Sequence, residues 1–188
     1  YIEVPERNTS VYALYEAGIG QPNVQIDVDV ETVAGPNDNN ISVICRSNDK
    51  GWYELSLHSG GLWFIYKYEY ANGFTQLTKG GSTAINMQKA KNHMTVVCQG
   101  ERLALYINDV EIGSAKDTQF IKGSIGVSVS TFNISGAGVE FENLKIAVPD
   151  PANPPGGAIA PTLTPSATWW WAGNNYDGRW RGTTSQGE

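Results

Sequence analysis

Short runs in which apolar and polar residues alternate recur along the first 148 residues of the chain. The clearest is Val24-Gln-Ile26-Asp-Val28-Asp-Val30, and Gly, Asn and Asp turn signals separate such runs every 8 to 14 residues. A period of two places alternate side chains on opposite faces of a strand, and no helical period of useful length competes with it. The pattern predicts strands at residues 24–30, 41–46, 52–58, 62–70, 74–78, 94–98, 103–108, 111–115, 124–130 and 139–147. Many short strands at this spacing indicate an all-β antiparallel sandwich or barrel.

The composition changes abruptly after Val148. Prolines crowd residues 149–165 together with Thr and Ser, and repeated prolines fix φ, remove ladder donors and favour extended spacers. Four of the six tryptophans then follow within thirteen residues. We therefore divide the chain into a sandwich at 1–148, a Pro/Thr-rich linker at 149–168 and a Trp-rich tail at 169–188.

Charge and length narrow the classes of function. The net charge is −6, which excludes the basic footprint expected of a nucleic-acid partner. No apolar run approaches the roughly 20 residues that span a bilayer. Tyr1 opens directly into what resembles a strand, and we expect a processed N-terminus left by a cleaved export signal. A secreted or cell-surface location is the expectation.

Cys45 and Cys98 are the only cysteines, and each closes an alternating run. Both sulfurs fall on the apolar side of their strands, with Val43 in one run and Val96 in the other. A disulfide is feasible if the two strands are neighbours, and it would stabilise the fold by about 4 kcal/mol in the chain-entropy model. The alternative is two unpaired buried thiols that pack as small hydrophobes.

Several segments carry a family resemblance that spans about residues 20–148. These are the run Asn92-His-Met-Thr-Val-Val-Cys98 with its hairpin partner Leu103-Ala-Leu-Tyr106-Ile-Asn108, then Phe120-Ile-Lys-Gly123-Ser-Ile-Gly126-Val, and Val139-Glu-Phe141-Glu-Asn143. They resemble concanavalin A-like (laminin G-like) domains, including bacterial members similar to 3-keto-disaccharide hydrolases. The resemblance implies a jelly-roll β-sandwich. It does not choose a function, because this fold serves lectins, glycosidases and scaffolds alike.

Three carboxylates, on Asp27, Asp29 and Glu31, share one face of the predicted strand at 24–30 and its extension. Glucanases of the resembled fold carry a similar acidic run, and retaining chemistry needs two carboxyl groups about 5 to 5.5 Å apart. Asp27 departs from that pattern, where a Glu nucleophile is expected. The interpretation we favour is the solvated outer face of an edge strand, where charges discourage aggregation. We expect no enzyme activity.

The segment 62–70 is the most aromatic strand, and its two faces differ. Leu62, Phe64, Tyr66, Tyr68 and Tyr70 share one face, while Trp63, Ile65, Lys67 and Glu69 share the other. Aromatic side chains stack on sugar rings, and Tyr and Trp suit binding surfaces. The glycan-stacking candidates are Trp52, Trp63, Tyr66, Tyr68 and Tyr70. The alternative is core filling, which we favour for Phe64, with cross-strand pairing to Trp52 and Tyr53.

The chain contains one candidate metal loop and three candidate glycosylation sites. Asp38, Asn39 and Asn40 crowd one loop, where oxygen donors would suit Ca²⁺, but an ordinary turn explains them equally well. His58 and His93 have no partners at ligand spacing, so we expect no cofactor. Glycosylation sequons begin at Asn8, Asn40 and Asn133.

The tail is rich in aromatic residues, unlike a disordered segment. We expect it to dock on another copy or on a neighbouring protein through Trp169, Trp170, Trp171, Tyr176, Arg179, Trp180 and Arg181. A membrane-interface anchor is the second choice, and folding back on its own sandwich is the third interpretation. The sequence thus favours a non-catalytic, lectin-like extracellular module that acts in assembly or adhesion. A carbohydrate-binding module is the alternative, and a glycoside hydrolase comes third.

Overall fold

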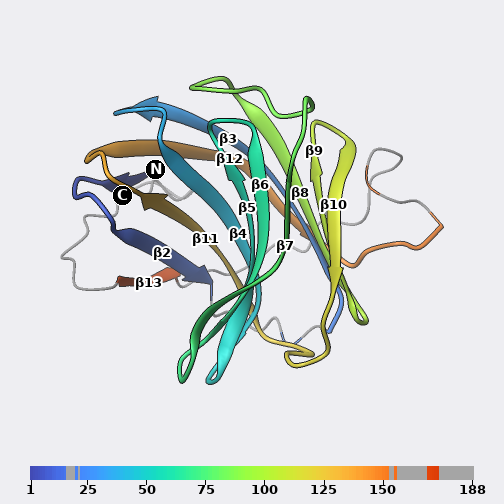
Figure 1. Cartoon of the computed structure of the whole chain (residues 1–188). Coiled ribbons are helices and arrows are strands. Elements are labelled where there is room, and N and C mark those ends of the chain that lie inside the picture. Colours follow the sequence, from blue (N-terminus) through green and yellow to red (C-terminus); the bar gives the residue numbers. More distant parts are fainter. Residues whose placement is uncertain (16–19, 21, 153–154, 156–168, 174–188) are drawn as a thin grey trace, which may run out of the picture.

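Two antiparallel sheets pack face to face in the computed structural model, which describes residues 1–15, 20, 22–152, 155 and the strand at 169–173 (Figure 1). One sheet has six strands, in the spatial order β1 (Ile2–Val4), β12 (Ala137–Ala147), β3 (Val24–Ala34), β8 (Asn92–Gln99), β9 (Arg102–Ile107) and β10 (Val110–Lys116). The other has seven, in the order β13 (Trp169–Gly173), β2 (Ser10–Tyr15), β11 (Ser124–Thr131), β4 (Asn39–Asn48), β5 (Gly51–His58), β6 (Leu62–Glu69) and β7 (Gly73–Gly81). In the described part of the chain, no helix is long and apolar enough to cross a membrane.

Alternation along the strands builds the core between the sheets. In β3, the apolar positions from Val24 to Val30 are buried, and the polar positions between them are half-buried on the outer side. The same alternation in β4, β5 and β8 turns Val43, Leu55 and Val96 inward. The predicted all-β sandwich is therefore confirmed, and each sheet has an inner face and an outer face.

A disulfide joins Cys45 of β4 to Cys98 of β8, with the two Cα atoms 6.7 Å apart. The predicted pairing is confirmed, but the two strands are not neighbours in one sheet. They belong to opposite sheets, so the bond crosses the core and links the two layers.

The hairpin turns follow their local chemistry. Asn108 and Asp109, with φ of 50° and 67°, connect β9 to β10 through two left-handed residues, a conformation that Asn and Asp tolerate. Asn72 and Gly73 end the turn of the hairpin that joins β6 to β7. Its loop has three residues, since Glu69 pairs with Gly73, and Gly73 takes the left-handed position at its end.

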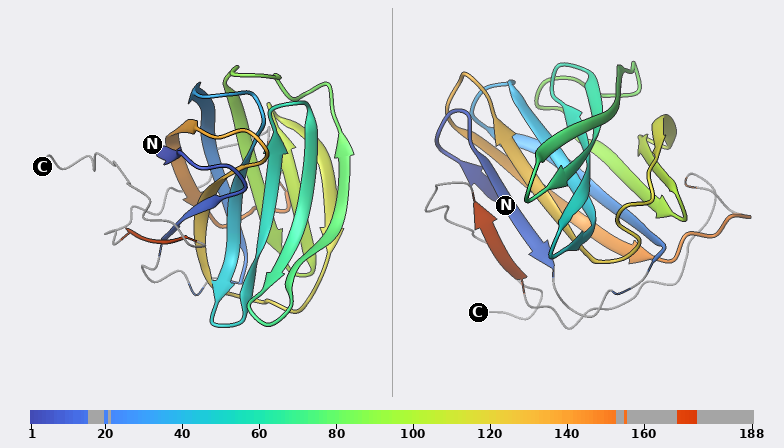
Figure 2. Two further views of the ribbon diagram at one scale, coloured as in Figure 1. Left: turned by 60° about the vertical axis from the view of Figure 1, so that its left-hand side comes forward. Right: turned by 60° about the horizontal axis from the view of Figure 1, so that its bottom comes forward.

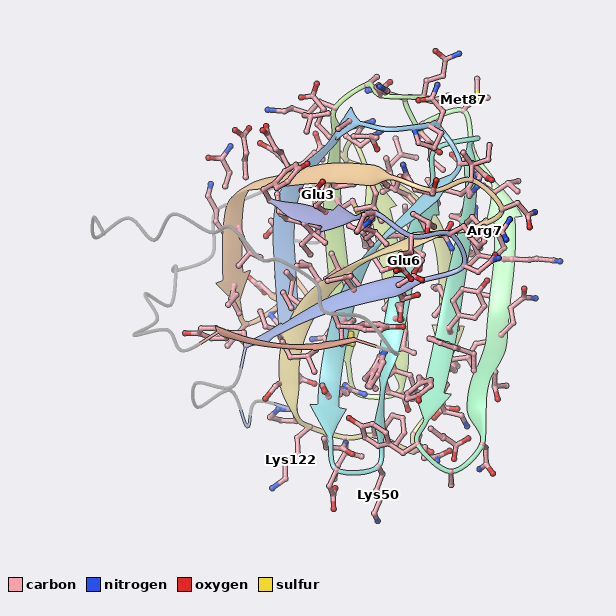
Figure 3. The ribbon with its side chains drawn as sticks, turned by 90° about the vertical axis from the view of Figure 1, so that its left-hand side faces the viewer. Glu3, Glu6, Arg7, Lys50, Met87 and Lys122 are labelled. Carbon is pink, nitrogen blue, oxygen red and sulfur yellow. A yellow bond between two sulfur atoms is a disulfide. The ribbon has the colours of Figure 1, made fainter. Side chains whose placement is uncertain are left out.

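Of the two N-terminal strands, β1 follows Tyr1 as the sequence suggested, whereas β2 was not predicted. Every residue from Val11 to Tyr15 of β2 is apolar or aromatic and buried, so β2 lacks the polar–apolar alternation on which the strand predictions rest. Figure 2 shows β2 beside β13 at one edge of the seven-stranded sheet. The turn with Lys50 and the loop with Lys122 lie at one end of the sandwich, and the loop with Met87 lies at the other (Figure 3).

Candidate functional site

The outer face of the seven-stranded sheet is aromatic because of the alternation in β6. Phe64, Tyr66 and Tyr68 face outward, while Ile65 is buried in the core. Phe64 was expected in the core and is instead half-buried on this outer face. The shared face of the tyrosines makes them available for contacts outside the sandwich.

Trp63 lies on the opposite side of β6. Its side chain is 7% exposed and belongs to the core between the sheets. Gly80 of β7 and Gly113 of β10 leave room for the indole, since a Cβ at Gly113 would come within 2.2 Å of a ring carbon of Trp63. The prediction that Trp63 stacks on a glycan is therefore wrong, because odd-numbered positions of β6 point inward.

Seven aromatic rings form one continuous set on the outer face, which we call the aromatic patch. Its members are Tyr12 of β2, Trp52 of β5, Phe64, Tyr66 and Tyr68 of β6, Tyr70 of the following turn, and Phe74 of β7. Trp52 stacks on Tyr68, with ring centroids 4.3 Å apart, and Tyr68 lies 4.7 Å from Phe74. Phe64 and Tyr66 are 5.5 Å apart and nearly parallel, at 13°. Of the predicted stacking residues, the structure thus brings together Trp52, Tyr66, Tyr68 and Tyr70.

The patch runs from a buried end to an exposed end. At the β2–β5 end, Tyr12 and Trp52 are 4% and 5% exposed and pack with Leu14 and Ile44. At the β6–β7 end, Tyr70 and Phe74 are 56% and 47% exposed. The buried end fixes the ring positions, and the exposed end leaves ring surface open to solvent.

Glu54 of β5 lies on the same outer face, and the sequence reasoning did not single it out. Its carboxylate accepts hydrogen bonds from Trp52 Nε1 at 3.2 Å and from Ser128 Oγ at 3.1 Å. The residue is buried, and among the described residues no lysine, arginine or histidine forms an ion pair with it. Burial raises the pKa of the Glu54 carboxyl, although hydrogen bonds from Ser42, Trp52 and Ser128 oppose the shift.

Glu54 thereby orients the central ring of the patch. Accepting the Trp52 N–H ties the indole to its own strand, so the ring keeps its position over Tyr68. Burial, and then the charge of Glu54, raise the pKa values of Tyr12 and Tyr66. Both phenols therefore stay protonated at neutral pH and can donate a hydrogen bond.

Small polar side chains continue the outer face toward β11. Ser42 and Ser56 pair across β4 and β5 with their hydroxyl oxygens 2.8 Å apart, and both are fully buried. His58 at the end of β5 contacts Asp38 at 3.3 Å, and its ring lies against Phe132. The face therefore combines an aromatic half with a hydroxyl-lined half.

The acidic residues Asp27, Asp29 and Glu31 lie on the outer face of the other sheet. Their strand is central, between β12 and β8, so the expectation of an edge strand is wrong. Asp27 accepts a hydrogen bond from Thr95 at 2.6 Å.

Asp29 is held by His93 Nδ1 and by Asn143 Nδ2, both at 2.7 Å. Burial alone would raise the pKa of Asp29, but hydrogen bonds from Asn143 and His93 lower it overall. A glycosidase acid needs the opposite shift.

Of the metal candidates, Asp38 directly precedes β4, and Asn39 and Asn40 begin it. Asp38 and Asn39 contact neighbouring residues, whereas Asn40 Oδ1 is buried with no hydrogen-bond partner among the described residues. The Asn39 amide donates to Pro36 O at 3.2 Å and to Thr32 Oγ1 at 3.4 Å, while Asp38 faces His58. Asn40 is 8% exposed. Among the described residues, no group of three or more His, Cys, Asp or Glu side chains is placed to hold a metal ion.

The first residues of the tail form β13, which pairs with β2 of the same chain from Trp169 opposite Tyr15 to Gly173 opposite Val11. The third interpretation, folding back on its own sandwich, is what the structure contains for these five residues. The remaining docking candidates, Tyr176, Arg179, Trp180 and Arg181, lie outside the described residues.

No family model matches the sequence, and no curated protein is similar to it in sequence. Solved structures match the fold. The carbohydrate-binding module CBM66 from Bacillus subtilis is 18% identical, with a TM-score of 0.61 over 77% of this chain and 84% of that one. A tetrameric galectin from the ball sponge Cinachyrella is 9% identical, with a TM-score of 0.54 over 71% and 96%. The homodimeric agglutinin CG-16 from chicken liver is 8% identical, with a TM-score of 0.53 over 72% and 99%. The chain thus shares the concanavalin A-like jelly-roll β-sandwich fold of these structures.

Proposed function

We propose that this protein is a non-catalytic carbohydrate-binding module and that the aromatic patch is its glycan-binding surface. The observation that carries the proposal is the exposed end of the patch, where Tyr70 and Phe74 join half-buried Tyr66 and Tyr68. Sugar rings pack their C–H faces on aromatic rings, and tyrosine adds a hydroxyl for hydrogen bonding. CBM66, which shares this fold, is named as a carbohydrate-binding module, which agrees with the proposal.

Rigidity of the patch supports affinity. Trp52 is wedged between Tyr12 and Tyr68, and its N–H is held by Glu54. Rings held in place lose little conformational freedom when a ligand binds, so less of the stacking energy is spent on ordering them.

The carboxylates support binding and not hydrolysis. Glycoside hydrolysis uses a pair of carboxyl groups across the scissile bond. Among the described strands of the seven-stranded sheet, Glu54 is the one acidic residue on the outer face. Glu69 of β6 lies on the same side of its strand as Trp63 and Ile65, which point inward, and its carboxylate is 3.9 Å from Lys67 Nζ. A single buried carboxyl fits a positioning role for Trp52.

A glycan array with the intact protein, followed by titration of each hit, tests the proposal. Tyr66→Ala and Phe74→Ala each remove one ring of the exposed end, and we expect affinity to fall by at least about tenfold per ring. Ile121→Ala is the matched control, since Ile121 is 64% exposed and lies outside the patch. No hit on the array, or equal losses in the control, would refute the proposal.

Assembly through the tail is the second candidate function. β13 pairs with β2 of the same chain and ends the seven-stranded sheet, so the observation that favours assembly is the outer edge of β13, since a strand edge readily pairs with a strand of another molecule. We propose that the module acts outside the cell, where a core disulfide such as Cys45–Cys98 persists. Sizing the protein with and without residues 165–188 tests the assembly role, because loss of the tail should abolish concentration-dependent oligomers.

A further inference from the structure

The less buried rings of the aromatic patch follow a single strand. Phe64, Tyr66 and Tyr68 occupy successive outward positions of β6, and Tyr70 continues them into the turn. Figure 1 shows β6 between β5 and β7, in agreement with the strand register. At about 3.3 Å per residue, the part of β6 from Phe64 to Tyr68 is about 13 Å long. The rings therefore form a row along the strand and not a cluster around one point.

Among the described side chains, a ligand that lies along β6 meets more open rings than one that lies across the strands. Toward β5, Phe64 lies opposite Ser56, which is fully buried. Tyr68 lies opposite Trp52, which is 5% exposed. Toward β7, Phe74 lies opposite Tyr68, and the sheet order ends at this strand. The direction of β6 is therefore the one along which ring contacts can accumulate.

Polar side chains of the edge strand β7 accompany the row. Gln76 lies opposite Tyr66 and Lys79 lies opposite Phe64, and directly opposite residues share one face of a sheet. Both polar side chains are exposed, and neither forms an ion pair with another described residue. The glutamine amide donates and accepts hydrogen bonds, and the ammonium group donates three. This flank of the row therefore suits the hydroxyl groups of sugars.

The rings along the row differ in tilt. Phe64 and Tyr66 are nearly parallel, at 13°, whereas Tyr66 and Phe74 meet at 73°. Tyr68 and Tyr70 meet at 82°. A flat crystalline face stacks best on coplanar rings, whereas a single chain can twist to follow rings of changing tilt. The angles favour a single glycan chain over a crystal surface.

We propose that the aromatic patch binds a single glycan chain lengthwise along β6, through about three consecutive internal sugar units. This lengthwise binding rests on the carbohydrate-binding function proposed above and names its ligand class, a soluble linear polysaccharide and not a terminal sugar. Phe64, Tyr66 and Tyr68 each stack on one unit, because a sugar ring is similar in width to an aromatic ring. Gln76 and Lys79 bind hydroxyl groups along one side of the chain.

Oligosaccharides of increasing length test lengthwise binding. They are prepared from the soluble glycan that the array identifies and titrated by calorimetry into the intact protein. We expect affinity to rise over about the first three sugar units, as the row is filled, and then to level off. The longest oligosaccharide should bind equally well with both end units capped by methyl groups, since internal units make the contacts.

A substitution at one end of the row separates long ligands from short ones. Phe64→Leu removes a ring but keeps an apolar side chain at a half-buried position, so we expect the fold to be retained. It should weaken binding of the longest oligosaccharide about tenfold and of the shortest ligand by about twofold or less, because a short ligand can use the other rings. Ile121→Ala, at an exposed position outside the patch, should change neither.

The outcomes distinguish the binding mode from the function. Absence of any glycan on the array refutes carbohydrate binding and lengthwise binding together. Affinity that is complete with one sugar unit, or that is lost when the ends are capped, overturns lengthwise binding and leaves the carbohydrate-binding function standing. Equal losses for short and long ligands in Phe64→Leu, or binding confined to an insoluble crystalline glycan, overturn it in the same way.

Discussion

Removal of the disulfide between the sheets should cost a large share of the stability of the domain. Cys45 and Cys98 are separated by 53 residues and are both fully buried. Closing a loop of that length reduces the entropy of the unfolded chain, and the chain-entropy relation gives about 4 kcal/mol at 25 °C. Since a change of 1 kcal/mol shifts Tm by about 2–4 °C in a domain of this size, the expected loss is about 10 °C.

The measurement compares urea unfolding of three samples: the oxidised protein, the same protein reduced after unfolding and refolded in reductant, and Cys45→Ala/Cys98→Ala. The reduced protein keeps both sulfurs, so it isolates the loss of the cross-link, while the double variant adds a small cavity. Loop closure acts on the unfolded state, so the m-value should rise when the bond is absent. If the reduced protein loses less than about 1 kcal/mol, the unfolded chain is not a free loop and the reasoning fails.

Three further substitutions probe single features of the structure. Glu54→Gln should raise stability at neutral pH, because the raised pKa of Glu54 favours its neutral form in the folded state. The parent protein therefore loses stability as pH rises from the ordinary pKa of 4.5 through the raised one, by about 1.4 kcal/mol per pKa unit. Urea unfolding of both proteins across pH measures the difference, and parallel plots of stability against pH would contradict it. Gly113→Ala drives a Cβ into Trp63 and should cost about 1–3 kcal/mol in thermal unfolding, whereas Gly81→Ala, with only ordinary contacts, should cost much less. Asp29→Asn should destabilise the fold at neutral pH and match the parent protein in strong acid, because a lowered pKa stabilises the fold only above it; an unchanged gap in acid would argue against the assigned hydrogen bonds.

Alternation was sufficient to place most strands, because a half-buried strand must repeat every two residues. It could not decide which face of β6 is the inner one, since Trp63 and Ile65 on one side and Tyr66 and Tyr68 on the other are all large and partly apolar. The register decides it: Trp63 pairs with Leu57 and Gly80, and only this side leaves space for the indole.

The other differences between the sequence predictions and the structure arise from contacts between strands that are far apart in the sequence. The sequence shows that Cys45 and Cys98 point inward but not that their strands belong to opposite sheets. The face on which Glu54 lies could have been predicted, because Glu54 is two residues from both Trp52 and Ser56 and must share their side of the strand. Its burial was not, since that depends on Tyr12 and Ser128 from strands far along the chain.

The outer faces of the two sheets differ in the side-chain surface that they leave without a contact inside the molecule. On the six-stranded sheet, the carboxylates of Asp27 and Asp29 find Thr95, His93 and Asn143 on neighbouring strands, so that face is self-paired. On the seven-stranded sheet, apolar ring surface at Phe74 remains exposed although the rings behind it are packed. Exposed apolar area held rigidly on a packed base is the usual mark of a binding surface, whereas satisfied charges mark a solvated one. The aromatic patch, and not the acidic run, is therefore the outer surface that keeps exposed apolar area on a packed base.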